Sequence, residues 1–205
     1  MALDEYKRKR DFSKPPEPAG RLAQRKGREL FFCVQKHLAS HLHYDLRLEH
    51  NGVLLSWAVP KGPSLDPKTK RLAMKVEDHP LEYGEFEGVI PEGYGAGIVM
   101  LWDRGTCTPQ VDDVDAALKK GDLKFTLDGY KLKGSWVLVR TSEGYARRGR
   151  SSVGPSVGPS FSSGDRGDQR TWLLIKHRDD WAGDLDIAEF APRSVKSDGD
   201  FENIL

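Results

Sequence analysis

Apolar and polar side chains alternate along residues 42–49. The apolar positions are Leu42, Tyr44, Leu46 and Leu48, and the polar positions between them are His43, Asp45, Arg47 and Glu49. Successive side chains of a β-strand point to opposite faces, so this period of two predicts a strand with one apolar and one polar face. Asn51-Gly52 follows at once and favours a type I′ hairpin turn. Residues 53–59 then form a second apolar run, which ends at Pro60.

The rest of the chain contains more strand-like than helical segments. Further strand-like runs are 71–76, 97–102, 124–127 with 131–132, 135–140 and 171–176. The best helix candidate is 111–120, which is acidic at its start and basic at its end, as the helix dipole favours. Many short strands with frequent turns and little helix predict a mainly β fold. We expect a compact antiparallel β-barrel, with a sandwich as the alternative, and a few short peripheral helices.

Charge is distributed unevenly along the chain. Residues 1–30 carry nine Lys or Arg and five Asp or Glu, whereas residues 181–205 carry two and six. We therefore expect a basic, partly ordered arm over 1–30, a β-barrel domain over 31–182 and an acidic tail over 183–205.

One stretch within the predicted domain has the composition of a loop. Ser, Gly and Pro make up twelve of the eighteen residues from 151 to 168, and five arginines lie between Arg147 and Arg170. Such a composition buries little apolar surface. We interpret 144–170 as a flexible loop, across which the two strand-like runs on either side could pair as a hairpin.

Overall composition narrows the class of protein. The chain has 205 residues, a net charge of +1 and 38% hydrophobic residues, which suits a soluble domain with a modest core. No apolar run approaches the roughly 18 residues of a membrane span. The first residues lack the apolar segment of a signal peptide, and two cysteines are too few for a disulfide scaffold. These features exclude membrane, secreted cystine-rich, collagenous and wholly disordered classes, and we expect a cytoplasmic protein.

The polar face of the first strand carries the most informative chemistry. Neighbouring positions on one face of a strand lie about 7 Å apart, so His43 and Asp45 can reach one ion while Arg47 remains for an anion. His37, upstream of the predicted strand, is the natural second imidazole. Two imidazoles and a carboxylate suit Mn²⁺, Fe²⁺ or Zn²⁺, and a neighbouring guanidinium fits phosphate chemistry. The alternative is an ordinary exposed polar face.

Other candidates carry weaker signals. His79 precedes Pro80, which favours extended backbone and suits a side chain presented from a strand end. The segment 93–97, Gly-Tyr-Gly-Ala-Gly, lacks the Lys-Ser/Thr of a phosphate-binding loop, so we interpret it as a hairpin turn. We interpret His50 as a turn residue, His177 as structural and Cys33 as a buried thiol.

Several longer segments form an ordered set of motifs. They are YKRKRDF (6–12), PEPAG (16–20), FCVQKHLASHLHYDLRLE (32–49), SWAVPKGPS (56–64), RLA (71–73), VEDHPLEY (76–83), FEGVIPEG (86–93) and WDRGT (102–106). In this order they resemble the 3′-phosphoesterase domain family of bacterial DNA ligase D. The turn Gly93-Tyr94-Gly95 is one residue shorter than the Gly-x-Tyr-Gly of that family, which would shift the rim of its groove.

The resemblance implies a β-barrel with a metal site in a surface groove and an activity that heals 3′ ends of a DNA primer paired to a template. A Mn²⁺-dependent phosphodiesterase step would remove a 3′-terminal ribonucleoside, and a phosphomonoesterase step would remove the remaining 3′-phosphate to leave a 3′-OH. The cofactor would be Mn²⁺, with Co²⁺ or Zn²⁺ as alternatives.

The resemblance also implies roles for individual residues. By motif match, the metal ligands would be His37, His43 and Asp45. The phosphate-binding residues would be Arg47 and His79, together with Lys61 and Arg71, which match basic residues tied more to the monoesterase step. Tyr83 would complete the catalytic site, and Gln35 and Glu77 match supporting polar positions.

The resemblance also suggests partners, and the residues themselves leave two rival functions open. We expect a stand-alone, monomeric, nucleoid-associated member of the family, which hands DNA ends to a separate ligase or polymerase and works beside an end-binding protein. One rival is a non-haem iron oxygenase that uses His43, Asp45 and His79 as ligands. The other is a non-catalytic DNA-end-binding module that binds DNA through the basic arm.

Overall fold

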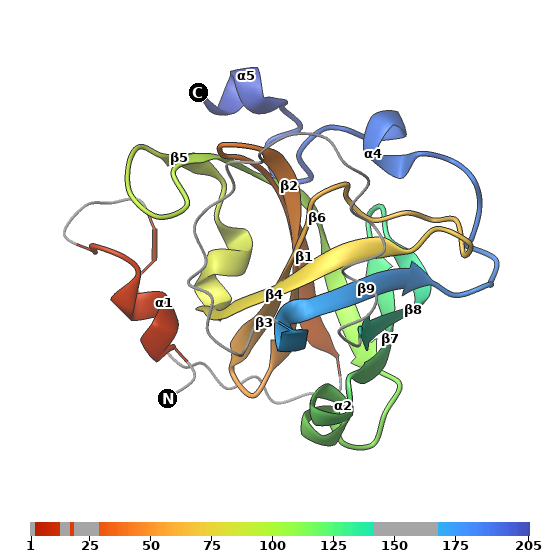
Figure 1. Ribbon diagram of the computed structural model, residues 1–205. Helices are drawn as coiled ribbons and strands as arrows, with labels where there is room; N and C mark the ends of the chain where they lie inside the picture. Colours follow the sequence, from red (N-terminus) through yellow and green to blue (C-terminus); the bar gives the residue numbers. More distant parts are fainter. Residues whose placement is uncertain (1–2, 13–16, 19–28, 142–167) are drawn as a thin grey trace, which may run out of the picture.

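The computed structural model describes residues 3–12, 17–18, 29–141 and 168–205. Within these residues, nine strands form one antiparallel sheet (Figure 1). The strands are β1 (Leu30–Leu38), β2 (Leu42–His50), β3 (Val53–Val59), β4 (Arg71–Pro80), β5 (Gly88–Ile90), β6 (Gly97–Pro109), β7 (Asp122–Gly129), β8 (Lys133–Arg140) and β9 (Thr171–Lys176). The helical segments are α1 (Asp4–Arg8), η1 (Leu81–Glu85), α2 (Val114–Lys120), η2 (Asp168–Arg170), α4 (Ile187–Phe190) and α5 (Phe201–Ile204).

The sheet closes into a barrel. Its strand order is β1-β2-β3-β4-β9-β8-β7-β6, and β6 pairs again with β1, while the short β5 is added to the edge of β6. The prediction of a mainly β, antiparallel barrel with few short helices is confirmed. No helix in the described ranges is long and apolar enough to cross a membrane.

Two predicted hairpins are present. Asn51 and Gly52 join β2 to β3 with φ angles of 48° and 79°, the left-handed conformations that a type I′ turn requires. β8 and β9 pair from Trp136 opposite Lys176 to Arg140 opposite Trp172. The connection between them, which we predicted to be a flexible loop, lies largely outside the described residues.

The apolar face of β2 points into the barrel as predicted. Tyr44, Leu46 and Leu48 belong to a core that also contains four buried tryptophans, Trp57, Trp102, Trp136 and Trp172. Two pairs of rings meet edge to face, Tyr44 with Trp102 and Trp57 with Trp172. Aromatic side chains bury about 150–250 Å² each, so these rings supply much of the apolar area that stabilises a barrel of this size.

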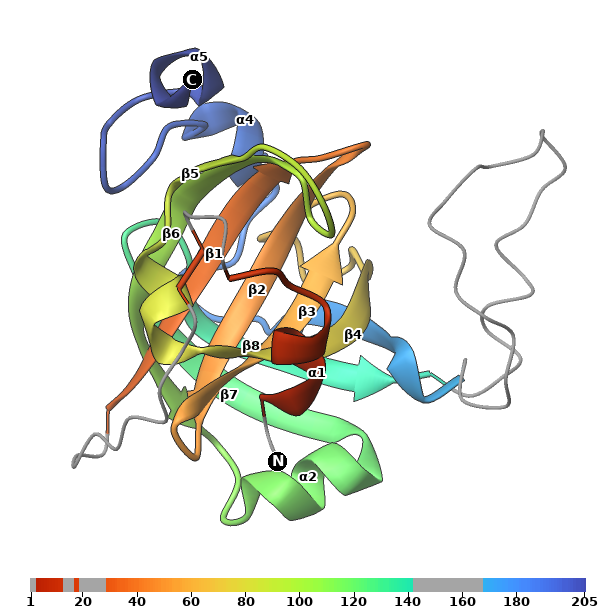
Figure 2. The ribbon, with the colours of Figure 1, turned by 90° about the vertical axis from the view of Figure 1, so that its left-hand side faces the viewer.

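The polar face of β2 points out of the barrel but is covered. Asp45, Arg47 and Glu49 are all buried, with Arg47 only 2% exposed. The cover comes from η1 and from α1, which packs against the end of β4 (Figure 2). The polar face is therefore the floor of a covered site rather than an ordinary solvated strand face.

The ends of the other elements follow from local signals. α2 starts at Val114 because the side chain of Asp113 accepts a hydrogen bond from the Ala116 N–H, and it ends at Gly121, which has a φ of 86°. The acidic C-terminal segment packs on β6, where the Trp102 indole donates to the carbonyl of Ala191.

Candidate metal and phosphate site

His37 and His43 lie on neighbouring strands. Antiparallel pairing of β1 with β2 places the two residues directly opposite each other, with ring centroids 4.8 Å apart. His37 precedes the strand that carries His43, as we expected, but the sequence did not predict that His37 lies in a strand of its own, β1. The turn between residues 38 and 42 is short enough for the two histidines to share one sheet position.

The two histidines and Asp45 are grouped so that they could hold a metal ion. His37 Nδ1 is 3.8 Å from Asp45 Oδ2, and His43 Nε2 is 3.7 Å from Asp45 Oδ1. One potential ligand atom from each residue lies within 4.8 Å of the other two. Donors that share one ion at about 2.1 Å are roughly 3–4 Å apart, so this spacing suits a divalent cation with little side-chain adjustment.

Backbone carbonyls fix the proton on each imidazole. His37 Nε2 donates to the carbonyl of Gly95 at 2.9 Å, and His43 Nδ1 donates to the carbonyl of His41 at 3.0 Å. A carbonyl can only accept, so the proton of each neutral ring is on the nitrogen away from Asp45. The nitrogen nearest Asp45 then presents a lone pair, which is the arrangement found around metal-binding histidines.

Asp45 is held in its charged form. Burial alone would raise its pKa, but the Arg47 guanidinium, His37 and His43 bring the pKa well below its usual range. The donor set therefore comprises two imidazoles and one carboxylate, which fits Mn²⁺ and related ions.

Arg47 connects the metal donors with the rest of the site. Its Nη2 donates to Asp45 at 3.0 Å, its Nε to Gln35 at 2.6 Å and its Nη1 to Ser56 at 2.8 Å. Arginine has five N–H groups. Three are used in these bonds, so two remain for a phosphate oxygen.

His79 is a neutral base at the other end of this network. Its Nδ1 donates to the carbonyl of Glu77 at 2.9 Å, so its Nε2 is unprotonated and accepts from Arg10 at 3.2 Å. Burial lowers the pKa of His79 well below 6.5, and the positive charges of Arg47 and Arg10 lower it further. His79 therefore accepts hydrogen bonds as it stands, and donates to a phosphate oxygen only after it takes up a proton.

Tyr83 and Gln35 contact the network that contains Arg47 and His79. The Tyr83 ring lies 4.9 Å from the Arg47 guanidinium and 4.8 Å from the His79 ring. Burial keeps the pKa of Tyr83 far above its ordinary value, so the phenol stays protonated. Gln35 donates to the carbonyls of Tyr83 and Phe86, which ties η1 to the strand that carries His37.

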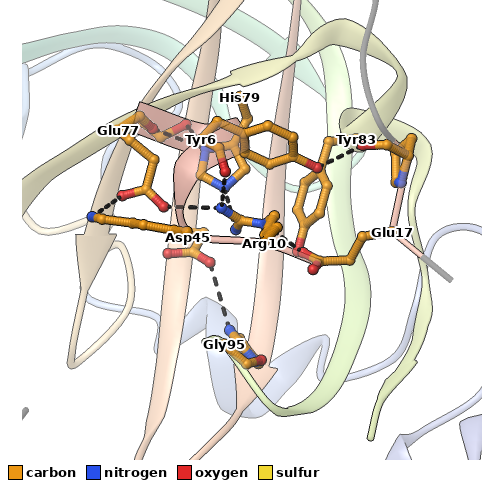
Figure 3. Close-up of polar contacts among 12 residues, drawn as sticks. Tyr6, Arg10, Glu17, Asp45, Glu77, His79, Tyr83 and Gly95 are labelled. Carbon is orange, nitrogen blue, oxygen red and sulfur yellow. Dashed lines mark hydrogen bonds and ion pairs between the residues drawn. The ribbon is translucent and has the colours of Figure 1, made fainter. Parts of the chain in front are cut away.

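The N-terminal arm contributes residues to which the sequence assigned no role. Arg10 points into the group formed by Glu77, His79 and Glu17 (Figure 3). It bonds Glu77 at 3.2 Å and Glu17 at 2.9 Å, and its guanidinium lies 4.0 Å from the Tyr6 ring.

Lys9 also bonds Glu77, at 3.0 Å. Burial alone would raise the pKa of Glu77, but its own backbone N–H, Lys9 and Arg10 lower it. The basic run at positions 7–10 and the likeness over 6–20 were the signals that pointed to this arm, but they gave it no position in space.

Comparison with known proteins decides the family. The family model described as the DNA ligase D 3′-phosphoesterase domain matches residues 35–140. The chain belongs to the DNA ligase D 3′-phosphoesterase family.

Relatives agree with this assignment. The multifunctional non-homologous end joining protein LigD of Pseudomonas aeruginosa is 50% identical over 96% of this chain. The proteins of the same name from Mycobacterium bovis and Mycolicibacterium smegmatis are 44% and 42% identical over 68% of it. The chain spans about a fifth of the length of these relatives, 21%, 18% and 19% respectively.

Two further predicted residues of this phosphoesterase domain are Lys61 and Arg71. Lys61 is exposed in the turn after β3. Arg71 begins β4, eight positions before His79, and alternation puts it on the same face as the core residue Ala73. Its Nε is buried without a hydrogen-bond partner in the described part of the chain. Among the described residues, no hydrogen bond or ion pair joins Lys61 or Arg71 to the metal donors.

The oxygenase ligand set fits this phosphoesterase domain poorly. It requires His79 as the third ligand beside His43 and Asp45, but His79 Nε2 faces the Arg10 guanidinium. The imidazole that joins His43 and Asp45 is His37 instead.

Proposed function

We propose that this domain is a Mn²⁺-dependent phosphoesterase that heals DNA 3′ ends. It would remove a 3′-terminal ribonucleoside from a primer paired to a template and then remove the 3′-phosphate to leave a 3′-OH. A ligase or polymerase would then use that end. The names of the relatives, which refer to non-homologous end joining, support DNA ends as the substrate.

One observation carries the proposal. The metal donors His37, His43 and Asp45 adjoin two buried groups suited to phosphate, Arg47 and His79, within one hydrogen-bonded network. A bound divalent ion would polarise a phosphoryl oxygen and lower the pKa of a bound water. Co²⁺ or Zn²⁺ would suit the same donors.

Side chains of the domain would bind the phosphate and stabilise the charge that develops on it. Arg47 would bind phosphate oxygens through its two unused N–H groups and stabilise negative charge that develops there. His79 would gain a proton at Nε2 as the negative phosphate approaches and then donate a hydrogen bond. Tyr83 would supply a phenol O–H, and Gln35 and Glu77 would hold Arg47, Arg10 and Lys9 in place.

A primer assay tests the proposal. A 5′-labelled DNA primer that ends in one ribonucleotide is annealed to a longer template and incubated with the protein in Mn²⁺ or in EDTA, beside an all-deoxy primer. We expect shortening only in Mn²⁺, to a 3′-phosphate and then to a 3′-OH product. His43→Ala should abolish both steps, whereas His50→Ala, at the far end of the same strand, should retain them.

The alternatives give different results. If wild-type protein left the primer intact in Mn²⁺ but slowed its migration in a gel, the result would favour the end-binding module over the proposed enzyme. Equal cleavage in EDTA would exclude a metal-dependent reaction. If His43→Ala were as active as His50→Ala, the reaction would not depend on the predicted metal ligands.

A further inference from the structure

Tyr94 lies at the rim of the site in the loop that joins β5 to β6. The next residue, Gly95, provides the carbonyl that His37 Nε2 bonds at 2.9 Å. The Tyr94 ring is therefore one residue away from the contact that orients a predicted metal ligand. No role in the chemistry above uses this ring.

Three tyrosine rings surround the Arg10 guanidinium. Their centroids lie 4.0 Å (Tyr6), 5.9 Å (Tyr83) and 5.7 Å (Tyr94) from it. Tyr6 and Tyr83 are buried, whereas Tyr94 is 45% exposed. The Lys9 ammonium lies 4.9 Å from the Tyr94 ring. Of the three rings, Tyr94 alone extends from the cationic part of the site to solvent.

Packing of the loop does not explain why an aromatic residue stands there. Gly93 and Gly95, on either side of Tyr94, have φ angles of 90° and 83°, and a Cβ built at either position would meet no atom within 4 Å. The backbone on both sides of the ring therefore borders open space. A flat, partly exposed ring beside cations and a phosphate-binding network is the type of surface on which a nucleobase stacks.

We propose that Tyr94 stacks on the base of the 3′-terminal nucleoside and positions it for removal. This inference rests on the proposed function. Internal bases of a strand have neighbours on both faces, but the terminal base has none on its 3′ side. A protein ring on that face therefore adds a contact that internal bases do not need, and it holds the terminal nucleoside beside the scissile phosphate.

A cycle of residue and substrate changes tests the inference. Two primers are compared, one that ends in adenosine and one that ends in 1-deoxyribose, which keeps the 2′-OH but lacks the base. For each, KM and kcat are measured in Mn²⁺, and Kd is measured in EDTA. Wild-type protein should bind the adenosine primer about tenfold more tightly, as base–aromatic stacking predicts, with most of the kinetic effect in KM.

Variants separate stacking from a structural role. Tyr94→Ala should bind both primers equally, and Tyr94→Phe should keep the preference because the ring remains. Tyr130→Ala removes an exposed tyrosine from the β7–β8 turn, away from the site, and should behave as wild type.

Two results would count against the inference, and a third would count against the proposed function alone. If Tyr94→Ala weakened the binding of both primers equally and kept the tenfold preference, the ring would serve only to position Arg10 and Lys9. If binding weakened tenfold when the penultimate base was removed, and not when the terminal base was removed, the ring would stack on the penultimate nucleoside and the inference would be wrong. If wild-type protein cleaved neither primer, the proposed function would fail, but the Kd ratio in EDTA would still decide for or against stacking on Tyr94.

Discussion

Asp45 and Arg47 form a buried ion pair whose partners should be energetically coupled. The Asp45 Oδ2 and Arg47 Nη2 atoms are 3.0 Å apart, and the two side chains are 10% and 3% exposed. Arg47→Met would leave the Asp45 carboxylate buried without its guanidinium partner, and would also remove the donors to Gln35 and Ser56. Removal of one partner of a buried pair costs about 3–5 kcal/mol, so we expect a loss of unfolding free energy in that range.

The double variant Asp45→Asn/Arg47→Met distinguishes charge pairing from simple packing. It buries neither charge, so its loss should be smaller than the sum of the single losses by about 2 kcal/mol. The assay is urea unfolding followed by circular dichroism, at pH 7 in EDTA so that no metal compensates the carboxylate.

A surface pair provides the matched control for this cycle. Lys133 and Asp128 are 2.7 Å apart, but their side chains are 31% and 77% exposed. The cycle Asp128→Asn/Lys133→Met should give a coupling below about 1 kcal/mol. If the losses at Asp45 and Arg47 were additive to within about 0.5 kcal/mol, the buried pair would not be the centre of the network, and our description of the site would be wrong.

Three further predictions concern protonation, packing and the two reaction steps. Burial and two nearby guanidinium groups hold the pKa of His79 well below 6.5, so below pH 6.5 the unfolded chain gains a proton there that the folded protein does not. Stability should therefore fall by up to about 1.4 kcal/mol per pH unit, and His79→Gln should flatten this slope in urea titrations at pH 7.5 and 5.5; parallel slopes would contradict it. Gly105→Ala should lower the melting temperature strongly, because its Cβ would lie 2.0 Å from a β7 carbonyl oxygen, whereas Gly183→Ala, with no atom within 4 Å, should not; equal melting temperatures would refute the packing argument. Arg71→Ala should spare diesterase activity more than monoesterase activity in the primer assay, and equal loss would defeat that assignment.

Local signals were enough to predict much of the barrel. The alternation over residues 42–49 gave β2 with the correct apolar face, and Asn51-Gly52 gave the turn after it. The runs 135–140 and 171–176 were predicted to pair and do so as β8 and β9. These features depend on periodicity and turn chemistry, which are written in neighbouring residues.

Features that depend on distant pairing could not be predicted from the residues alone. The position of His37 opposite His43 requires the register of β1 on β2. Closure of the sheet into a barrel depends on pairing of β1 with β6, from Leu38 opposite Ile98 to Leu30 opposite Cys107. The contact of Arg10 with His79 joins residues 69 positions apart. The likeness to a known family named several of these residues, but it gave neither their hydrogen bonds nor the burial that shifts their pKa values.

The number of Mn²⁺ ions that the protein binds tests the central claim most directly. Electron paramagnetic resonance of free Mn²⁺ measures this number without any substrate. We expect one tight site per chain in wild-type protein, loss of that site in Asp45→Asn, and an unchanged site in His50→Gln, whose histidine pairs with Asp115 outside the donor set. If Asp45→Asn bound Mn²⁺ as wild type does, then His37, His43 and Asp45 would not form the metal site, and the proposed phosphoesterase chemistry would lose its basis.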